Sequence, residues 1–410
     1  METDRQRLDQ PIAALPAGTR LLHIGPHKTG TTAVQGALFA ARDRLPSHNV
    51  AFPAHTRHPM EAALAACARP AMIGDTAPTD RHWTRLLDQV RATGGRTSVV
   101  SSEFFADASD DATAARIVRQ LGGASGDSGA GGAGGAGGAG AERVHVLVTL
   151  RPLARILPSQ WQQYVQNGLR MGYEDWLEHL LRKPPYDRPN PSFWRRHRHD
   201  RLVERWARAV GPERTTVVVV DDRDRDGLLR TFEALLALPP GLLRPVPDTA
   251  NRSLTLAETE MLRNLNVHFR AGGLPEELYS QLIRHGAVMQ MKNAFRPSAD
   301  DPGIRTPRWA VEEAGRTGAE MAGRIAALGV RILGDPAVLS AVPEVAEPAP
   351  GAPRIAPEAA AQALYGVLAA ASAAPVRHTS PAKARPVHQV TSKELVGVLA
   401  RRALRRLRRH

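Results

Sequence analysis

The segment that most constrains the fold is a short apolar strand followed by a glycine-bounded turn and a helix. Residues 20–25 (RLLHIG) have the length and apolar content of a buried strand, and apolar residues recur at helical spacing from Thr32 to Leu45. In such a segment, backbone N–H groups and the positive end of the helix dipole converge on one point. The segment therefore predicts an α/β fold with a site for an anion such as phosphate.

The rest of the first 335 residues continues this alternation. Further strands are expected at 49–52, 96–102, 143–150 and 215–220. Helical patterns lie around 59–68, 80–92, 110–121, 152–167, 199–210 and 227–238, and also over 255–294 and 306–335. Alternating strands and helices are typical of a parallel sheet covered on both faces. We therefore expect a three-layer α/β/α domain with a central parallel sheet and a helical C-terminal part.

Composition divides the 410-residue chain into further segments. Residues 1–19 form an N-terminal extension, and 20–335 are expected to be the folded domain. Within it, 122–140 are almost entirely glycine and alanine and are predicted to be a disordered insertion, because they bury too little surface to fold. The Ala/Pro-rich residues 336–390 are predicted to be a linker, with a weak helix near 357–373. Residues 391–410 are predicted to form a basic amphipathic helix.

The net charge of +13 is concentrated in this tail. Residues 383–410 contain nine Lys or Arg and one acid, Glu394, which leaves about +5 for the rest of the chain. This distribution does not indicate a specific nucleic-acid-binding protein. In the tail, Thr391 and Glu394 fit a capping box, and apolar residues recur at helical spacing among arginines. We expect either peripheral contact with an anionic membrane or partner, or a tail that is merely solvated.

The turn reads Gly25-Pro26-His27-Lys28-Thr29-Gly30-Thr31-Thr32. Against the nucleotide-binding pattern GxxxxGK[ST], Gly25, Gly30 and Thr32 fit, but Thr31 takes the lysine position. The lysine lies inside the turn instead, at Lys28, which is the only lysine in residues 1–182 although the chain holds 54 Lys and Arg. An ammonium group at this position would lie beside the bridging atoms of a bound anhydride.

The stretch HIGPHKTGTTAVQ resembles the 5′-phosphosulfate loop of sulfotransferases that use 3′-phosphoadenosine 5′-phosphosulfate (PAPS). The resemblance covers roughly residues 20–335 and is nearest to bacterial members, including some related to carbohydrate sulfotransferases. It implies a P-loop-like fold in which Lys28, Thr29, Gly30, Thr31 and Thr32 hold the phosphosulfate. It also implies that Lys28 stabilises the phosphate as the sulfuryl group leaves.

A second motif strengthens the resemblance. The expected strand 143–150 is followed by Arg151, and Ser159 comes eight positions later. The family has an arginine and a serine at this spacing, and both bind the 3′-phosphate of the donor. A guanidinium makes forked, charge-assisted bonds to a phosphate, and a hydroxyl adds a further donor. The RKGxxGxxK segment of the cytosolic small-molecule enzymes is absent, so contacts to the adenosine, near 292–296, are not assigned.

Sulfuryl transfer requires a base that accepts the proton of the acceptor. Glu103 is the first candidate, because it lies at the carboxyl end of an expected central strand, where such sheets bind ligands. His27, within the turn, is a second candidate, either as a base or as a cofactor contact. His55 and His58 follow an expected strand and are further candidates for the acceptor side. Acceptor specificity is expected to depend on residues 53–80 and 168–195.

The resemblance implies transfer of a sulfuryl group from PAPS to a hydroxyl, or an amine, of a carbohydrate or glycolipid, with no metal. Two other readings remain open. The strand before Asp221 and Asp222 imitates a magnesium-binding strand of a kinase or NTPase, and the tail is compatible with a noncatalytic membrane- or polyanion-binding protein. The basic cluster at 195–201 is expected to be a solvated helix face. One cysteine, Cys67, and no apolar signal segment favour a cytoplasmic protein without disulfides.

Overall fold

The central feature of the fold is one six-stranded, all-parallel sheet with strand order β2-β3-β1-β4-β5-β6. The computed structural model describes residues 12–123, 141–183, 190–246, 252–298, 301–345 and 353–373. The strands are β1 (Arg20–Ile24), β2 (Val50–Ala51), β3 (Thr97–Ser101), β4 (Val144–Leu150), β5 (Thr215–Val219) and β6 (Arg331–Leu333). The α/β prediction and its five strands are confirmed, whereas β6 lies in a segment that was expected to be helical.

The register of the sheet brings four loops to one edge. Ile24 pairs with Val148, His23 with Ser101, and Leu150 with Val219. Because all strands run in the same direction, the segments after β1, β3, β4 and β5 emerge side by side. All seven residues of β4 are buried, as expected of a central strand in a sheet covered on both faces.

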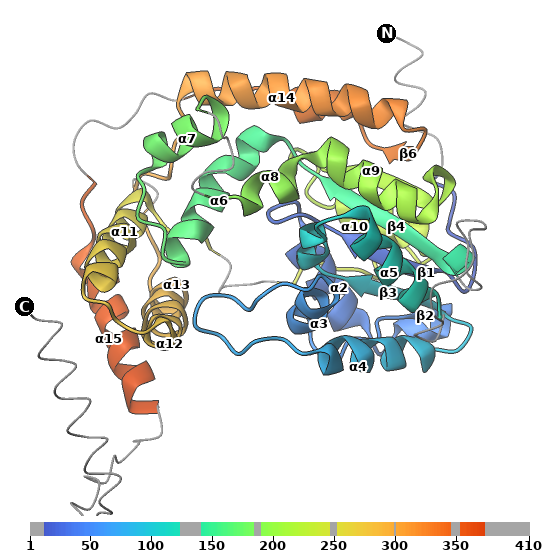
Figure 1. Ribbon diagram of the computed structural model, residues 1–410, viewed down its shortest axis with the longest axis horizontal. Coiled ribbons are helices and arrows are strands. Elements are labelled where there is room, and N and C mark those ends of the chain that lie inside the picture. Colours follow the sequence, from blue (N-terminus) through green and yellow to red (C-terminus); the bar gives the residue numbers. More distant parts are fainter. Residues whose placement is uncertain are drawn as a thin grey trace, which may run out of the picture.

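Helices cover both faces of the sheet and complete the three-layer arrangement. Helix α9 (His199–Val210) packs on β4 and β5 and against α5 (Asp111–Gly122). Helix α10 (Gly227–Leu235) packs against α2 (Thr31–Ala41), which follows β1. The helices before β3 are α3 (Met60–Ala66) and α4 (Asp80–Arg91), and α14 (Arg308–Ala327) lies along α9 (Figure 1).

A second apolar core lies in the helical part of the molecule. It is formed by α6 (Leu153–Gln166), α7 (Tyr173–Leu181), α11 (Leu256–Ala271), the π-helix η6 (Tyr279–Val288) and α13 (Met289–Ala294). Figure 1 shows α11, α13 and α15 (Pro357–Ala373) grouped beside the sheet rather than above it. Trp161 and Trp176 are fully buried in this core. Both indole rings therefore belong to the interior packing.

The helix expected near 357–373 is present as α15, and it is packed rather than free. It lies against η6, where an added Cβ at Gly366 would come within 2.5 Å of the carbonyl oxygen of Gly286. The packed part of the chain therefore extends beyond residue 335. The insertion at 122–140 is outside the described residues apart from 122 and 123, as is the tail at 391–410. Among the described helices, none has the length and apolar character needed to span a bilayer.

Candidate functional site

The loop between β1 and α2 is shaped by its own hydroxyl groups. Thr31 Oγ1 donates to the Gly25 carbonyl oxygen at 2.7 Å, and Thr29 Oγ1 donates to that of Pro26 at 2.7 Å. An added Cβ at Gly25 would lie 1.9 Å from Thr31 Oγ1, so only glycine fits there. Gly30 has a φ of 93° and precedes the first turn of α2, where N–H groups have no intrahelical partner. The loop therefore presents backbone donors to an anion.

The threonines predicted to hold the phosphosulfate differ in their exposure. The side chains of Thr29 and Thr31 are buried and already donate within the loop, whereas Thr32 is half-buried. In this geometry the backbone N–H groups of Thr31 and Thr32, rather than the Thr29 and Thr31 hydroxyls, are the donors at the start of α2.

Lys28 lies within this loop and has a left-handed backbone conformation, with φ at 72°. Its Nζ donates to Gln163 Oε1 of α6 at 3.3 Å. Burial lowers the pKa of Lys28 to about 8; the nearby cations Lys292 and Arg151 act in the same direction, while the Glu103 carboxylate opposes them. The ammonium group is therefore within electrostatic range of two other cations and one carboxylate.

Lys292 is a site residue that the sequence indicated only as part of an unassigned region, 292–296. It lies on α13, whose last turn is held by Arg252: the guanidinium donates to the carbonyl oxygens of Met291 and Lys292 at 2.9 and 3.3 Å. Arg252 also forms a bidentate pair with Glu258 at 2.7 and 2.9 Å. This bracing brings a cation from the helical part of the molecule into electrostatic range of Lys28.

Arg151 follows β4 and is hydrogen-bonded both to the loop between β1 and α2 and to the segment after β5. Its Nη1 donates to the carbonyl oxygen of Lys28 at 3.3 Å, and its Nη2 donates to Asp222 Oδ2 at 2.7 Å. Asp222, which follows β5, is also 3.7 Å from Arg155. Asp222 thus accepts an arginine pair at this edge of the sheet, and Asp221 pairs with Arg223. The described residues contain no group of three or more acids, histidines or cysteines placed to hold a metal ion.

A cavity of about 530 Å³ opens beside Arg151, and it contains Ser159. The Ser159 hydroxyl donates to the Ile156 carbonyl oxygen at 3.1 Å, and it would have to turn from that oxygen to donate to a bound anion. Arg155 and Arg305 also line the cavity. The structure therefore brings the two residues of the Arg–x7–Ser motif into one arginine-lined cavity, next to the loop that holds Lys28.

Glu103 begins the 3₁₀ helix η2 (Glu103–Asp107), directly after β3. Ser102 caps η2 by accepting a hydrogen bond from the Phe104 N–H at 3.3 Å. The Glu103 carboxylate raises the pKa values of both Lys28 and Arg196, so it lies within electrostatic range of each. Its position after the carboxyl end of β3 is the one that the sequence predicted for it.

His27 is less suited to act as a base. Its ring meets Phe104 edge-on at 5.0 Å between centroids, and its Nδ1 is buried without a hydrogen-bond partner among the described residues. Burial, followed by the neighbouring Arg196 and Lys28, holds its pKa well below the usual value. A buried ring that resists protonation in this way is poorly suited to accept a proton.

Of the two histidines after β2, His58 contacts α2. His58 Nδ1 is 2.5 Å from Gln35 Oε1, and Gln35 in turn donates to the Ser101 carbonyl oxygen at 2.9 Å. His55 is exposed. Arg57 donates to the Thr32 carbonyl oxygen at 3.0 Å, which fixes this loop against the first turn of α2.

The expectation of a solvated face at 195–201 is wrong. Arg196, in α8 (Ser192–His197), donates from Nε and Nη2 to the two oxygens of the buried Asp107, at 2.9 and 2.6 Å. His197 and His199 are fully buried and neutral, because burial lowers the pKa of each, that of His199 to about 4. The run of arginines and histidines suggested an exposed face, because their buried partner Asp107 lies far away in the sequence.

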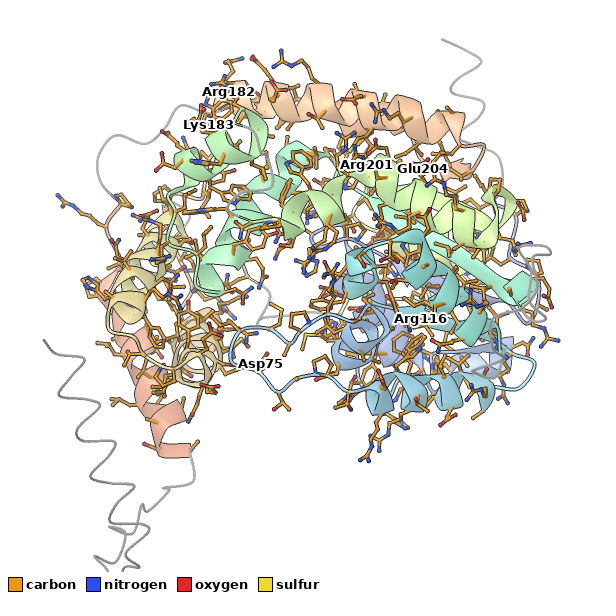
Figure 2. All side chains as sticks on the ribbon, viewed as in Figure 1. Asp75, Arg116, Arg182, Lys183, Arg201 and Glu204 are labelled. Carbon is orange, nitrogen blue, oxygen red and sulfur yellow. The ribbon has the colours of Figure 1, made fainter. Side chains whose placement is uncertain are left out.

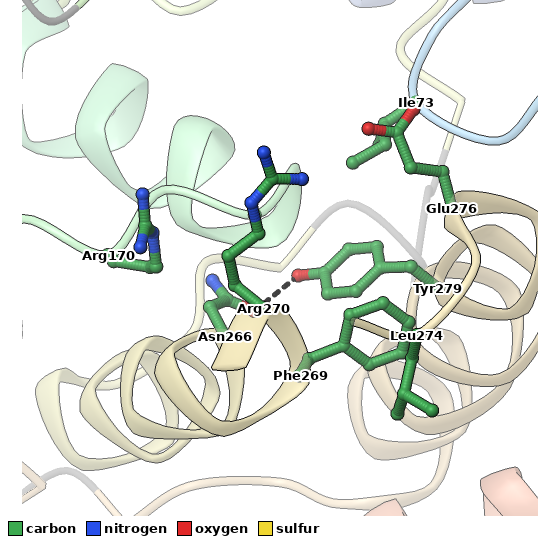
Figure 3. A pocket seen from close by; sticks show the side chains of 9 residues that line it. Ile73, Arg170, Asn266, Phe269, Arg270, Leu274, Glu276 and Tyr279 are labelled. Carbon is green, nitrogen blue, oxygen red and sulfur yellow. Dashed lines mark hydrogen bonds between the residues drawn. The ribbon is translucent and has the colours of Figure 1, made fainter. Parts of the chain in front are cut away.

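The two segments expected to set acceptor specificity meet at a second cavity, of about 200 Å³ (Figure 3). Ile73 comes from the first segment, and Gly168 and Arg170 come from the second. Arg270 and Tyr279 also line this cavity. Gly168 follows the end of α6, five residues after Gln163, which accepts the hydrogen bond from Lys28.

The loop that carries Ile73 is fastened to the helical part of the molecule. Figure 2 shows Asp75 where this loop approaches α12 (Glu276–Leu278). Asp75 Oδ1 accepts hydrogen bonds from Ser280 and Arg284, the latter at 2.9 Å. Gly74 approaches so closely that an added Cβ would lie 2.1 Å from the Glu276 carbonyl oxygen.

Comparison with known proteins gives one structural neighbour. No family model matches the sequence, and no curated protein matches it. A crystal structure of a sulfotransferase from Alicyclobacillus acidocaldarius is similar over 64% of this chain and 98% of its own, with 17% identity and a TM-score of 0.37.

Proposed function

We propose that the protein is a sulfotransferase that moves a sulfuryl group from PAPS to a hydroxyl of a carbohydrate or glycolipid. The observation that carries the proposal is the junction between Lys28 and Arg151. The Arg151 guanidinium touches the main chain of Lys28 and also lines the cavity that holds Ser159. A ligand with two separate anionic groups, one on the loop and one at Arg151 and Ser159, matches this arrangement.

The donor has the required pair of anions. Its 5′-phosphosulfate would lie on the loop, against backbone N–H groups and Lys28, and its 3′-phosphate would lie in the cavity between Arg151 and Ser159. The cavity volume of about 530 Å³ is within the range of small-molecule sites. Lys292 would add positive charge on the side of the loop nearest the helical part of the molecule.

In the proposed reaction the acceptor oxygen attacks sulfur while the bond from sulfur to the bridging oxygen breaks. Glu103 would accept the proton of the acceptor hydroxyl, and adenosine 3′,5′-bisphosphate would leave with the bridging oxygen. Lys28, close to that oxygen, would stabilise the negative charge that develops on the phosphate. Glu103 lies within electrostatic range of Lys28, as a proton acceptor and a leaving-group cation that serve one sulfuryl group must.

Binding of adenosine 3′,5′-bisphosphate and of ATP–Mg, measured by calorimetry, tests the proposal. We expect micromolar binding of the bisphosphate and a loss of tenfold or more in Arg151→Ala, because charge-assisted hydrogen bonds contribute about 1.5–3 kcal/mol each. Ser159→Ala should weaken binding less. Tight binding of ATP–Mg with no preference for a 3′-phosphate would refute the proposal and favour a kinase or NTPase.

A further inference from the structure

Helix α15 leaves a cluster of large apolar side chains in solvent. Leu364, Tyr365 and Leu368 are 68%, 59% and 65% exposed, and they lie within one and a half turns of the helix. We call these three residues the outer face of α15. Adjacent exposed side chains of this size are uncommon on a soluble domain and mark a surface that contacts something.

The direction of this face is fixed by tight packing on the other side of the helix. Ala359, Ala363 and Gly366 are buried, and the backbones of α15 and η6 come into contact at Gly366 and Gly286. Polar contacts add to this: Gln290 Nε2 donates to Gln362 Oε1 at 2.9 Å, and Gln281 Nε2 donates to the Ala370 carbonyl oxygen at 3.1 Å. These contacts hold α15 against the domain, so its outer face points away from the core.

The segment that follows this face in the sequence is strongly basic. From residue 359 to residue 373 the chain has no charged residue, and the 37 residues that follow contain ten Lys or Arg against the single acid Glu394. An uncharged apolar face is therefore joined directly to a strongly basic segment.

We propose that the outer face of α15 binds the surface of a membrane that contains anionic lipids. Its two leucines would enter the boundary between headgroups and acyl chains, while the basic residues after 373 would be drawn to the anionic headgroups. Peripheral attachment generally needs two such signals together, one apolar and one electrostatic. Tyr365 suits this boundary, because its ring is apolar and its hydroxyl stays hydrated.

A second copy of the chain fits this face less well. A stable protein interface buries about 800 Å² on each partner, whereas the outer face has three large side chains. A symmetric pair would also bring two basic segments of like charge together. An anionic lipid surface has the opposite charge and no fixed shape to match.

The single cysteine allows a direct test at the face itself. Cys67 is 2% exposed, and burial raises its pKa to about 12, so it should resist labelling. An environment-sensitive fluorophore attached to Leu368→Cys would report on the outer face, and the same label on Val246→Cys, an exposed position after α10, would be the control. With phosphatidylcholine vesicles containing 30% phosphatidylserine, we expect a blue shift at 368 and none at 246. With phosphatidylcholine alone, we expect no shift at either position.

Sedimentation with the same vesicles tests the face by substitution. The Leu364→Ser/Leu368→Ser double variant of the full chain should lose at least tenfold in vesicle affinity, and Val246→Ser should bind like the native chain. The midpoints of thermal unfolding of both variants should match that of the native chain, which shows that they are folded. Because vesicle binding is measured without donor or acceptor, failure of the proposed sulfotransferase activity would leave this result interpretable.

Three results would overturn the proposal. If the double variant bound vesicles like the native chain, while truncation after residue 373 abolished binding, the tail alone would be the anchor. If the native chain ignored vesicles and formed a dimer that the double variant did not form, the face would bind a second copy. If the label at 368 were already shielded without vesicles, and the truncation exposed it, the chain's own tail would occupy the face.

Discussion

The Arg196 guanidinium and the Asp107 carboxylate form a bidentate ion pair in the interior, at 2.9 and 2.6 Å, and this pair joins α8 to the helix that begins with Glu103. Asp107 is the last residue of η2 and Glu103 is the first, so the pair fixes the short element that positions the proposed base. Arg195 donates to the same carboxylate at 3.1 Å, and it is more exposed.

We expect Arg196→Lys to lower kcat by about tenfold, because a lysine keeps the charge but cannot form the forked pair that holds η2. Affinity for adenosine bisphosphate should stay within twofold of the native value, since Arg196 lies on the Glu103 side of the loop. Arg195→Lys is the matched control and should change neither quantity. Equal losses of kcat and of bisphosphate affinity in Arg196→Lys would mean that the pair supports the whole site rather than Glu103.

Bisphosphate affinity should decrease as the pH rises through about 8. The pKa of Lys28 is lowered to about 8, so the side chain is cationic below this pH and neutral above it. The ligand's phosphates do not change charge above pH 7, because their second pKa is about 6. Calorimetry between pH 7 and 9 should show the decrease in the native chain. Lys28→Arg, which stays charged, should give a flat profile, and a decrease of the same size there would assign it to another group.

Asp222→Asn separates the sulfotransferase proposal from the kinase alternative. In the proposed site Asp222 competes with the 3′-phosphate for Arg151, so its neutralisation should tighten bisphosphate binding severalfold. In a magnesium-dependent kinase the same change would remove a metal ligand and weaken ATP–Mg binding. Calorimetry with both ligands distinguishes the two functions, because a sulfotransferase variant should bind the bisphosphate more tightly and a kinase variant should bind ATP–Mg more weakly. Asp221→Asn, whose partner is Arg223, should change neither affinity.

Acid should destabilise the protein well before its carboxylates are protonated. Burial lowers the pKa of His23 to about 3 and those of His145 and His199 to about 4, against 6.5 for an unfolded chain. Above pH 6.5 these histidines are neutral in both the folded and the unfolded state. Below that pH the unfolded chain takes up protons that the folded state does not, so the free energy of unfolding falls by about 1.4 kcal/mol per pH unit for each histidine. Denaturant unfolding between pH 6.5 and 4.5 measures this slope.

The variant His145→Gln provides the check on that slope. His145 Nε2 is 2.8 Å from Thr216 Oγ1, a partner that a glutamine amide can also reach. The variant should reduce the slope by about 1.4 kcal/mol per pH unit. An unchanged slope would show that His145 takes up its proton in the folded state as readily as in the unfolded chain.

The parts of the site that the sequence predicted are those determined by local order along the chain. Lys28, Glu103 and Arg151 each follow a strand, and in a parallel sheet this places them at one edge. Lys292 and Arg196 reach the site through tertiary packing, which neither spacing nor composition encodes. β6 was missed although Gly329 and Gly334, both with positive φ, mark its two ends. Its three residues are too few to show the alternation of a strand.

Lys28 carries its charge in a backbone conformation that glycine adopts without strain, with φ at 72°. A lysine there costs stability that a smaller residue would restore, and this cost is typical of positions kept for activity. The variant Lys28→Gly should therefore melt at a higher temperature than the native chain while losing the cation. If it does, the loop holds a residue that is unfavourable for the fold and useful only when a ligand is bound.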